Sequence, residues 1–366
     1  MKTNRSWIYP IAIIGLLANF TFGCEKDVDF EGGKGTQDDP YLIASPKQLD
    51  GMRHNLNRHF KQIADIDLSG YSSGEGWRPI GDEKNPFTGT FDGNSHNISN
   101  LTIDRPNMHY VGLFGMTEKS TIKNTGLVMI EITGELCLGG LVGHNGGDII
   151  NCYATGDVSG YGDAFGGLVG WNGGNITNSY ATAVISGYAA GVGGLVGENT
   201  GNITFCFATG DIPDGSYTGG LVGENRGKIA NSYATGNVTG GHFVGGLVGS
   251  NHEGGDIINS YAKGHVIGSR NVGGFVGWSS GSIRNCYATG NVAGSEYTGG
   301  LVGRYNGGNI EYSYYDKETT GQEDTGKGIP RTTVEMMQQS TFETWDFTNI
   351  WRINEGNSYP YLRWQE

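Results

Sequence analysis

A pentapeptide that returns every 26 to 28 residues constrains the fold of this chain more than any other feature. It reads Gly-Gly-(Leu/Phe)-Val-Gly, and each copy continues with Gly-x-Ile-x-Asn-Ser-Tyr-Ala-Thr-Gly-x-Val or a close variant. The copies begin at Gly139, Gly166, Gly193, Gly219, Gly245, Gly273 and Gly299. A degenerate copy begins at Val111, so residues 111–315 are one unit of about 27 residues repeated eight times.

Each unit consists of short apolar runs rich in β-branched residues, separated by glycine, asparagine and aspartate. This pattern predicts short strands joined by turns, because no stretch shows the 3.6-residue spacing of a helix. One unit cannot bury its apolar side alone, whereas stacked units build a continuous core. We therefore expect an all-β fold, a parallel β-solenoid (β-helix) of about eight coils with N- and C-terminal caps. A β-propeller is the structural alternative, but its blades need about 40 residues or more.

Equivalent positions of the units form columns of similar side chains. The aromatic column contains Tyr153, Tyr180, Phe207, Tyr233, Tyr261, Tyr287 and Tyr314. Residues two apart in a strand share a face, so Ile176, Asn178 and Tyr180 should all point into the core. The inward asparagine ladder predicted with them contains Asn151, Asn178, Asn231, Asn259 and Asn285. A bulge near the serine column would instead turn the tyrosines outward, as a flat platform for sugars.

The first 24 residues resemble a secretory signal. Lys2 and Arg5 precede a mostly apolar stretch of 16 residues, which is shorter than the ~20 residues needed to span a bilayer. Gly23 and Cys24 resemble the lipobox of bacterial lipoproteins, whose cysteine carries lipid. We expect a signal peptide over 1–23, a lipidated linker over 24–34 and anchoring at the outer membrane or cell surface. A cleaved signal without lipid is the alternative.

The Gly-Gly-Leu-Val-Gly units with Asn-Ser-Tyr-Ala-Thr-Gly resemble the GLUG motif of bacterial surface and secreted proteins. That family includes large adhesin-like proteins and some immunoglobulin A peptidases. The resemblance covers residues 111–315 and implies surface location and adhesion or binding, without supplying a catalytic site. Residues 35–110 are expected to form an N-terminal cap with the first coils, and residues 316–366 a C-terminal cap. Caps are needed because end coils otherwise expose apolar core and strand edges.

Three cysteines occupy the column that holds serine in other units: Cys152, Cys206 and Cys286. Cys152 and Cys206 lie two coils apart and Cys206 and Cys286 three, which corresponds to about 10 and 14 Å. A disulfide needs Cα atoms within about 7 Å, so these residues should be small packed side chains.

The sequence contains no metalloprotease, serine-hydrolase or phosphate-loop signature, and we expect neither enzymatic activity nor a cofactor. A formal charge of −13 disfavours nucleic acid as a partner. Glu198 and Glu224 hold equivalent positions on neighbouring coils, where like charges repel. A bound cation could relieve that repulsion, which makes the pair a weak metal candidate. Splaying of both side chains into solvent is the alternative that we favour.

The position directly after the pentapeptide varies most among the units, which indicates a solvent-facing site. It holds His144, Trp171, Glu198, Glu224, Ser250, Trp278 and Arg304. We predict ligand contacts at Trp171 and Trp278 and at the loop aromatics Tyr217, Phe243 and Tyr297, because exposed aromatic rings often contact glycans and proteins. Loop side chains that lie against the rod are the alternative.

These features predict a monomeric, lipid-anchored, non-enzymatic surface protein that binds a glycan or a host or matrix protein. Two alternatives stay open. Parallel β-helices include glycan lyases and hydrolases, so the chain could be a glycan-processing enzyme, or it could be a structural spacer or a component of a surface assembly.

Overall fold

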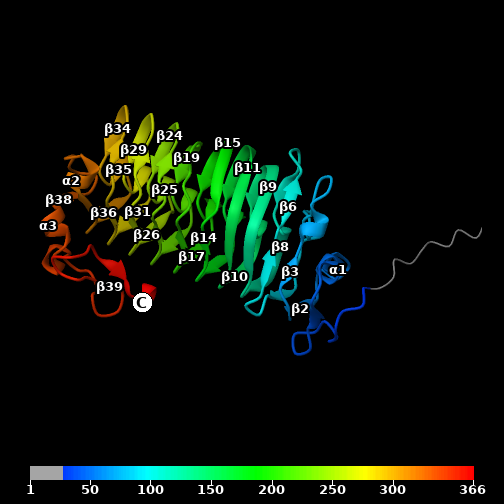
Figure 1. Cartoon of the computed structure of the whole chain (residues 1–366). Coiled ribbons are helices and arrows are strands. Elements are labelled where there is room, and N and C mark those ends of the chain that lie inside the picture. The colour runs from blue at the N-terminus through cyan, green and yellow to red at the C-terminus, as the bar shows by residue number, and fades with distance from the viewer. Residues whose placement is uncertain (1–27) are drawn as a thin grey trace, which may run out of the picture.

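The computed structural model describes residues 28–366, so the predicted signal peptide and Cys24 lie outside the described residues. The chain forms a rod of stacked coils, with the first strands at one end and the C-terminal helices at the other (Figure 1). The predicted parallel β-solenoid is confirmed, with about nine turns rather than eight. The additional turn arises because strands before residue 111 pair in parallel with the repeat units. No helix within residues 28–366 combines the length and apolarity needed to cross a membrane.

One side of the rod is a 17-stranded sheet, in which each strand pairs in parallel with the equivalent strand of the next coil. Its strands are β1 (Tyr41–Ile43), β2 (His59–Gln62), β4 (Thr90–Asp92), β8 (Phe114–Lys123), β10 (Val142–Ile150), β12 (Val169–Asn172), β13 (Asn175–Thr177), β16 (Val196–Asn199), β17 (Asn202–Thr204), β20 (Val222–Asn225), β21 (Lys228–Ala230), β25 (Val248–Asn251), β26 (Asp256–Ile258), β30 (Val276–Ser279), β31 (Ser282–Arg284), β35 (Val302–Tyr305) and β36 (Asn309–Glu311).

The remaining strands form a second large parallel sheet and two small sheets. The second sheet contains β3 (Ile66–Asp67), β5 (Asn97–Ser99), β6 (Thr102–Asp104), β7 (His109–Val111), β9 (Gly126–Gly139), β11 (Tyr153–Gly166), β14 (Tyr180–Ala181), β15 (Val184–Gly193), β18 (Phe207–Ala208), β19 (Ser216–Gly219), β22 (Tyr233–Ala234), β24 (His242–Gly245), β27 (Tyr261–Ala262), β29 (Arg270–Gly273), β32 (Tyr287–Ala288), β34 (Glu296–Gly299), β37 (Tyr314–Asp316) and β38 (Ile329–Arg331). One small sheet contains β23 (Val238–Thr239), β28 (Val266–Ile267) and β33 (Val292–Ala293), and the other contains β39 (Trp351–Arg352) and β40 (Tyr361–Leu362). The α-helices are α1 (Pro46–Gly51), α2 (Lys317–Thr320) and α3 (Thr333–Met336).

The interior of the rod is built from columns of one residue type each. Aliphatic columns such as Ile149, Ile176 and Ile203 are fully buried. The serine column also lies inside, where the Ser179 hydroxyl accepts a hydrogen bond from the Cys152 N–H at 3.1 Å. Cys152, Cys206 and Cys286 replace serine in this column as free thiols at most 1% exposed. They are packed side chains, as the spacing argument requires.

A buried asparagine ladder follows the first sheet. The first four side-chain amides each donate to the asparagine oxygen of the next coil at 2.8 Å, and the last donates to the Ser279 hydroxyl at 3.4 Å, which stabilises the stack from within. The ladder consists of Asn145, Asn172, Asn199, Asn225 and Asn251, all 0% exposed. It differs from the predicted ladder, whose residues Asn151, Asn178, Asn231, Asn259 and Asn285 adopt left-handed backbone conformations with φ of 49–53°. Asparagine tolerates this conformation better than most residues, so these positions are turns.

The prediction of inward tyrosines is wrong. The left-handed residue at the turn, Asn178 in the third unit, lies two positions before Tyr180 and reverses the alternation of faces. Ser179 and Ala181 therefore point into the core at 0% exposure, and Tyr180 points outward. The asparagine turn is the local irregularity that the alternative interpretation required.

The outward tyrosines do not form a flat platform for sugars. Neighbouring rings from Tyr153 to Tyr287 are stacked, with centroids 4.6–5.1 Å apart and planes within 13° of parallel. The faces of the rings therefore contact each other along the rod, and only the ring edges point outward. Sugar rings pack on aromatic faces, so this ladder is structural.

The C-terminal segment, residues 329–366, folds back along the rod (Figure 1). Its aromatic side chains pack on the end of the tyrosine ladder, at Tyr233, Tyr261, Tyr287 and Tyr314. Trp351 and Trp345 pack beside Tyr287, and the indole N–H of Trp364 donates to the Asn231 carbonyl at 3.0 Å. Tyr261, Tyr287 and Tyr314 are consequently buried to 2% exposure or less. The aromatic part of the segment thus covers one side of the solenoid. The end of the solenoid is closed by Tyr315, which packs on Gly300.

High pH should release this segment. Burial raises the pKa of Tyr261, Tyr287 and Tyr359 above the ordinary tyrosine value. A raised folded-state pKa contributes stability that is complete below the unfolded pKa of about 10 and is lost as the pH rises above it. We expect tyrosinate absorbance and tryptophan fluorescence to change together above about pH 10. Full titration of these tyrosines at about pH 10 with no change in fluorescence would contradict their burial beneath the segment.

Candidate functional site

The variable positions of the repeat form one continuous row on the first sheet, which we call the variable row. Its members are in register from coil to coil: His144, Trp171, Glu198, Glu224, Ser250, Trp278 and Arg304. Strand alternation directs this row outward, because the buried asparagine ladder occupies the next position. Six of the seven side chains are large and half-buried, and only Ser250 is small.

A second column lies beside the variable row, and we call it the left-handed column. Its residues have φ between 51° and 69°. Each of them lies two positions before the first glycine of the pentapeptide in its unit. They are Tyr110, Cys137, Ala164, Gly191, Tyr217, Phe243, Asn271 and Tyr297. Each residue of this column lies next to the variable residue of the following coil, as Tyr110 lies against His144 with ring centroids 5.7 Å apart. A left-handed φ in bulky aromatic residues is unusual and commonly marks a functional position.

The small side chain of Ser250 leaves a shallow pocket of about 350 Å³ between the two columns, which we call the Ser250 pocket. It lies between Glu224 and Trp278 in the variable row. It is lined by Tyr217, Phe243, Ser250, His252, Trp278 and Arg304. Tyr217 and Phe243 are stacked at 4.4 Å and 9°, and His252 packs against Trp278 at 5.5 Å and 57°. Three of the five predicted aromatic residues therefore meet here.

The other two predicted residues lie elsewhere. Trp171 stacks on His144 at 4.2 Å and 10°, several coils before the pocket, so a neighbouring ring already covers one of its faces. Tyr297 is 50% exposed and lies beside the pocket rather than in it. The guanidinium groups of Arg270 and Arg304 contact its ring at 5.4 and 4.9 Å from the centroid.

The glutamate pair is bridged by Arg226, which the sequence argument missed. One guanidinium nitrogen lies 2.5 Å from Glu198 and another 2.9 Å from Glu224, and His252 Nε2 lies 2.8 Å from Glu224. The two carboxylates are therefore not splayed apart into solvent, and a bound cation is not needed to relieve their repulsion, because Arg226 does so. Within residues 28–366 there is no group of three or more His, Cys, Asp or Glu side chains placed to hold a metal ion.

The two carboxyl groups differ in acidity. Burial raises the pKa of Glu198, and Arg226 opposes this only in part. Burial alone would also raise the pKa of Glu224, but the hydrogen bond with His252 and the charge of Arg226 outweigh it and lower that pKa. Glu224 is therefore hydrogen-bonded to His252, which lines one end of the Ser250 pocket.

Fold and site together define a β-solenoid with an outward row of variable side chains. Six segments match the family model described as the GLUG motif: 134–159, 161–186, 188–212, 214–239, 240–267 and 268–293. The chain therefore contains six copies of the GLUG motif, which fall in six of the eight units expected from the sequence.

Two curated relatives share the repeat. The first, "Putative Gly-rich membrane protein" of Evansella cellulosilytica, is 41% identical over 130 residues, which are 33% of this chain and 15% of the relative. The second, "Halomucin" of Haloquadratum walsbyi, is 39% identical over 148 residues, 37% of this chain and 2% of the relative. The matches thus cover only a small part of either relative.

A solved structure has the same fold. The crystal structure titled "a putative immunoglobulin A1 protease from Bacteroides ovatus" superposes with a TM-score of 0.54 over 92% of this chain and 96% of that chain. The sequences are 23% identical, so the likeness extends to the fold alone.

Proposed function

We propose that this protein is a non-enzymatic binding protein of the cell surface, and that the Ser250 pocket holds its glycan or protein ligand. The observation that carries the proposal is the pocket itself, where one small residue in a row of large ones is enclosed by aromatic rings from two columns. A volume of about 350 Å³ falls within the range of small-ligand sites. Aromatic walls with polar neighbours suit sugars and protein side chains alike.

Mutation of the pocket tests the proposal. The purified protein should bind at least one ligand in a screen against a glycan array and matrix proteins. Trp278→Ala or Tyr217→Ala should weaken the binding of that ligand about tenfold or more. Tyr161→Ala is the matched control, because Tyr161 is a 72% exposed aromatic residue outside the pocket. Equal loss in the control, or full binding by both pocket variants, would contradict the proposed site.

The bridged glutamates favour binding over catalysis. Glycosidases that use two carboxyl groups place the sugar between them, and here Arg226 occupies that space. Purified protein should therefore release no reducing ends from common polysaccharides. Turnover that is lost in Glu224→Gln would overturn the non-enzymatic part of the proposal.

Attachment through a lipid on Cys24 completes the proposed function. It is supported by the resemblance of residues 1–24 to a lipoprotein signal and by the name of the membrane-protein relative. Several acyl chains on one cysteine would hold the rod stably at a membrane. Wild-type protein should incorporate labelled palmitate in cells, whereas Cys24→Ser should remain unlabelled. A variant that still carries label would contradict the attachment site.

A further inference from the structure

We infer that the Ser250 pocket selects a sugar ring that carries a carboxylate, an inference that rests on the proposed function and specifies its ligand. The feature that points to an acidic sugar is Arg304, at the end of the pocket beyond Trp278. Neighbouring arginines are committed to carboxylates: Arg226 to Glu198 and Glu224, and Arg270 to Glu296 at 3.3 Å. Among the described residues Arg304 has no carboxylate partner.

Arg304 is also held in place. Its guanidinium lies 4.9 Å from the centre of the Tyr297 ring, and the side chain is half-buried. Packing on an aromatic ring leaves the edge of the guanidinium plane, with its N–H donors, free to bind a carboxylate through two parallel hydrogen bonds. A lysine at this position would present only a point charge.

The acidic character of the whole chain does not prevent such binding. The formal charge is −13, but charges beyond about 8 Å are largely screened at physiological ionic strength. The nearest carboxylate in the row, Glu224, is already paired with Arg226 and His252. A carboxylate in the pocket therefore interacts mainly with the unpaired guanidinium of Arg304.

Ser250 and Trp278 form the floor and one wall of the pocket. Ser250 is 1% exposed, and its Oγ has no hydrogen-bond partner among the described residues. Among the described residues Trp278 has one aromatic ring contact, a tilted one with His252, which leaves its indole available to the apolar side of a sugar. Indole and guanidinium together match an acidic pyranose.

The test compares oligomers that differ only in charge. Oligosaccharides of galacturonic, glucuronic and mannuronic acid are titrated into the full-length protein alongside their methyl esters. At least one free acid should bind about tenfold more tightly than its ester. Arg304→Gln should reduce that ratio to about one, whereas Arg284→Gln, a change at an exposed arginine outside the row, should preserve it.

The outcomes separate this inference from the proposed function. Equal binding of every acid and its ester, with loss of both in Trp278→Ala, would overturn the acidic-sugar inference and leave the pocket as the binding site. A preference for acids that survives Arg304→Gln would overturn the role of Arg304. No binding of any oligosaccharide would overturn the acidic-sugar inference, whereas the proposed function would fail only if the array and matrix proteins also revealed no pocket-dependent ligand.

Discussion

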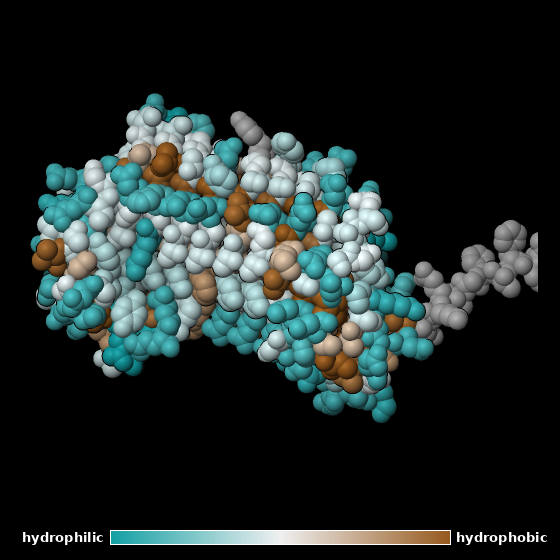
Figure 2. Space-filling model, in the orientation of Figure 1, coloured by the Kyte–Doolittle hydropathy of each residue, from teal (hydrophilic) through white to brown (hydrophobic). Residues whose placement is uncertain are grey.

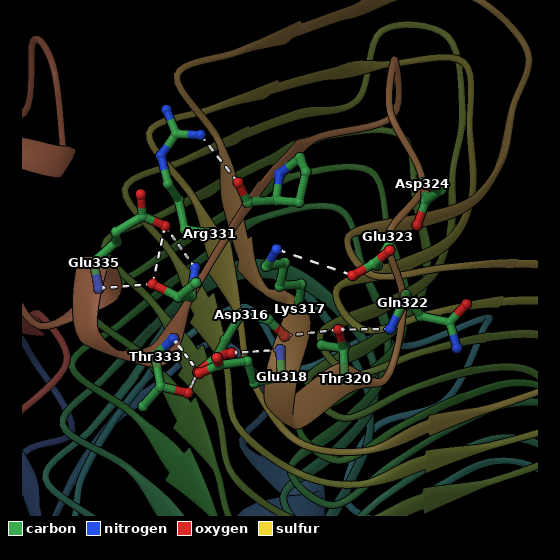
Figure 3. A network of polar contacts seen from close by, with 12 residues as sticks. Asp316, Lys317, Glu318, Thr320, Gln322, Glu323, Asp324, Arg331, Thr333 and Glu335 are labelled. Carbon is green, nitrogen blue, oxygen red and sulfur yellow. Dashed lines mark hydrogen bonds and ion pairs between the residues drawn. The ribbon is translucent and has the colours of Figure 1, made fainter.

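Replacement of Asp316 by alanine is expected to detach the C-terminal segment from the rod while the repeat coils remain folded. Asp316 is fully buried at the start of α2, where its Oδ1 accepts the N–H groups of Glu318 and Thr319 at 2.9 and 3.2 Å. Its Oδ2 accepts the hydroxyl groups of Thr333 at 2.7 Å and Tyr359 at 2.6 Å. Figure 3 shows the Asp316 carboxylate with two of these partners, Glu318 and Thr333. One side chain therefore ties α2, α3 and the returning segment together.

The expected loss is about 3–5 kcal/mol, because removal of the carboxylate leaves several donors unpaired in a buried position. The readouts are the free energy of unfolding and the rate at which a protease cuts within residues 329–366. Glu323→Ala is the control, since Glu323 is an exposed acidic residue of the same region whose carboxylate lies 3.9 Å from the Lys317 ammonium group. Wild-type stability and protease resistance in Asp316→Ala would show that the segment is held by ring packing alone.

Gly220→Ala is the second change expected to have a large effect, because it adds a single methyl group between two coils. A Cβ at Gly220 would lie 2.2 Å from the backbone oxygen of Gly246 and 2.9 Å from the Cβ of Ala234. Neither atom can move without opening the stack, since the next coil repeats the same contact. We expect a loss of about 3 kcal/mol or more, or a chain that fails to fold.

The matched control for this change is Gly241→Ala. At Gly241 the nearest atom to a Cβ is the Ser216 hydroxyl oxygen at 3.6 Å, an ordinary contact. Thermal unfolding followed by circular dichroism should therefore separate the two alanine variants clearly. Similar midpoints for Gly220→Ala and Gly241→Ala would contradict the tight coil contact at the glycine pair.

The coils could be predicted from the sequence because each column repeats one residue type, and stacking like on like is the only arrangement that buries every copy. The orientation of the tyrosines could not be predicted from strand alternation, since one left-handed residue reverses it. A signal for the reversal was present: asparagine, the residue that best tolerates this conformation, precedes the serine column in most units. The buried ladder of Asn145 and its equivalents carried a similar signal, an asparagine directly after the variable position.

The candidate site was predictable only in part. Variation among the copies indicated the variable row, and strand pairing places those residues in register. The meeting of Tyr217 and Phe243 with Trp278 depends on the left-handed column lying beside the next coil, which spacing alone does not reveal. The bridge formed by Arg226 depends on side-chain contacts between coils, and an alignment of the repeat units does not reveal such contacts. Surface composition gives no further guide, since the face in Figure 2 is mostly hydrophilic or neutral, with apolar residues in a broken band.

The central claim is that the small side chain at position 250 creates the binding site. Ser250→Trp tests it most directly, because the same row already holds tryptophan at Trp171 and Trp278, so the coil should accept the larger side chain. Calorimetric titration with a ligand that wild-type protein binds should show about a hundredfold loss of affinity in Ser250→Trp, with an unchanged unfolding midpoint. Wild-type affinity in the folded Ser250→Trp protein would contradict the account.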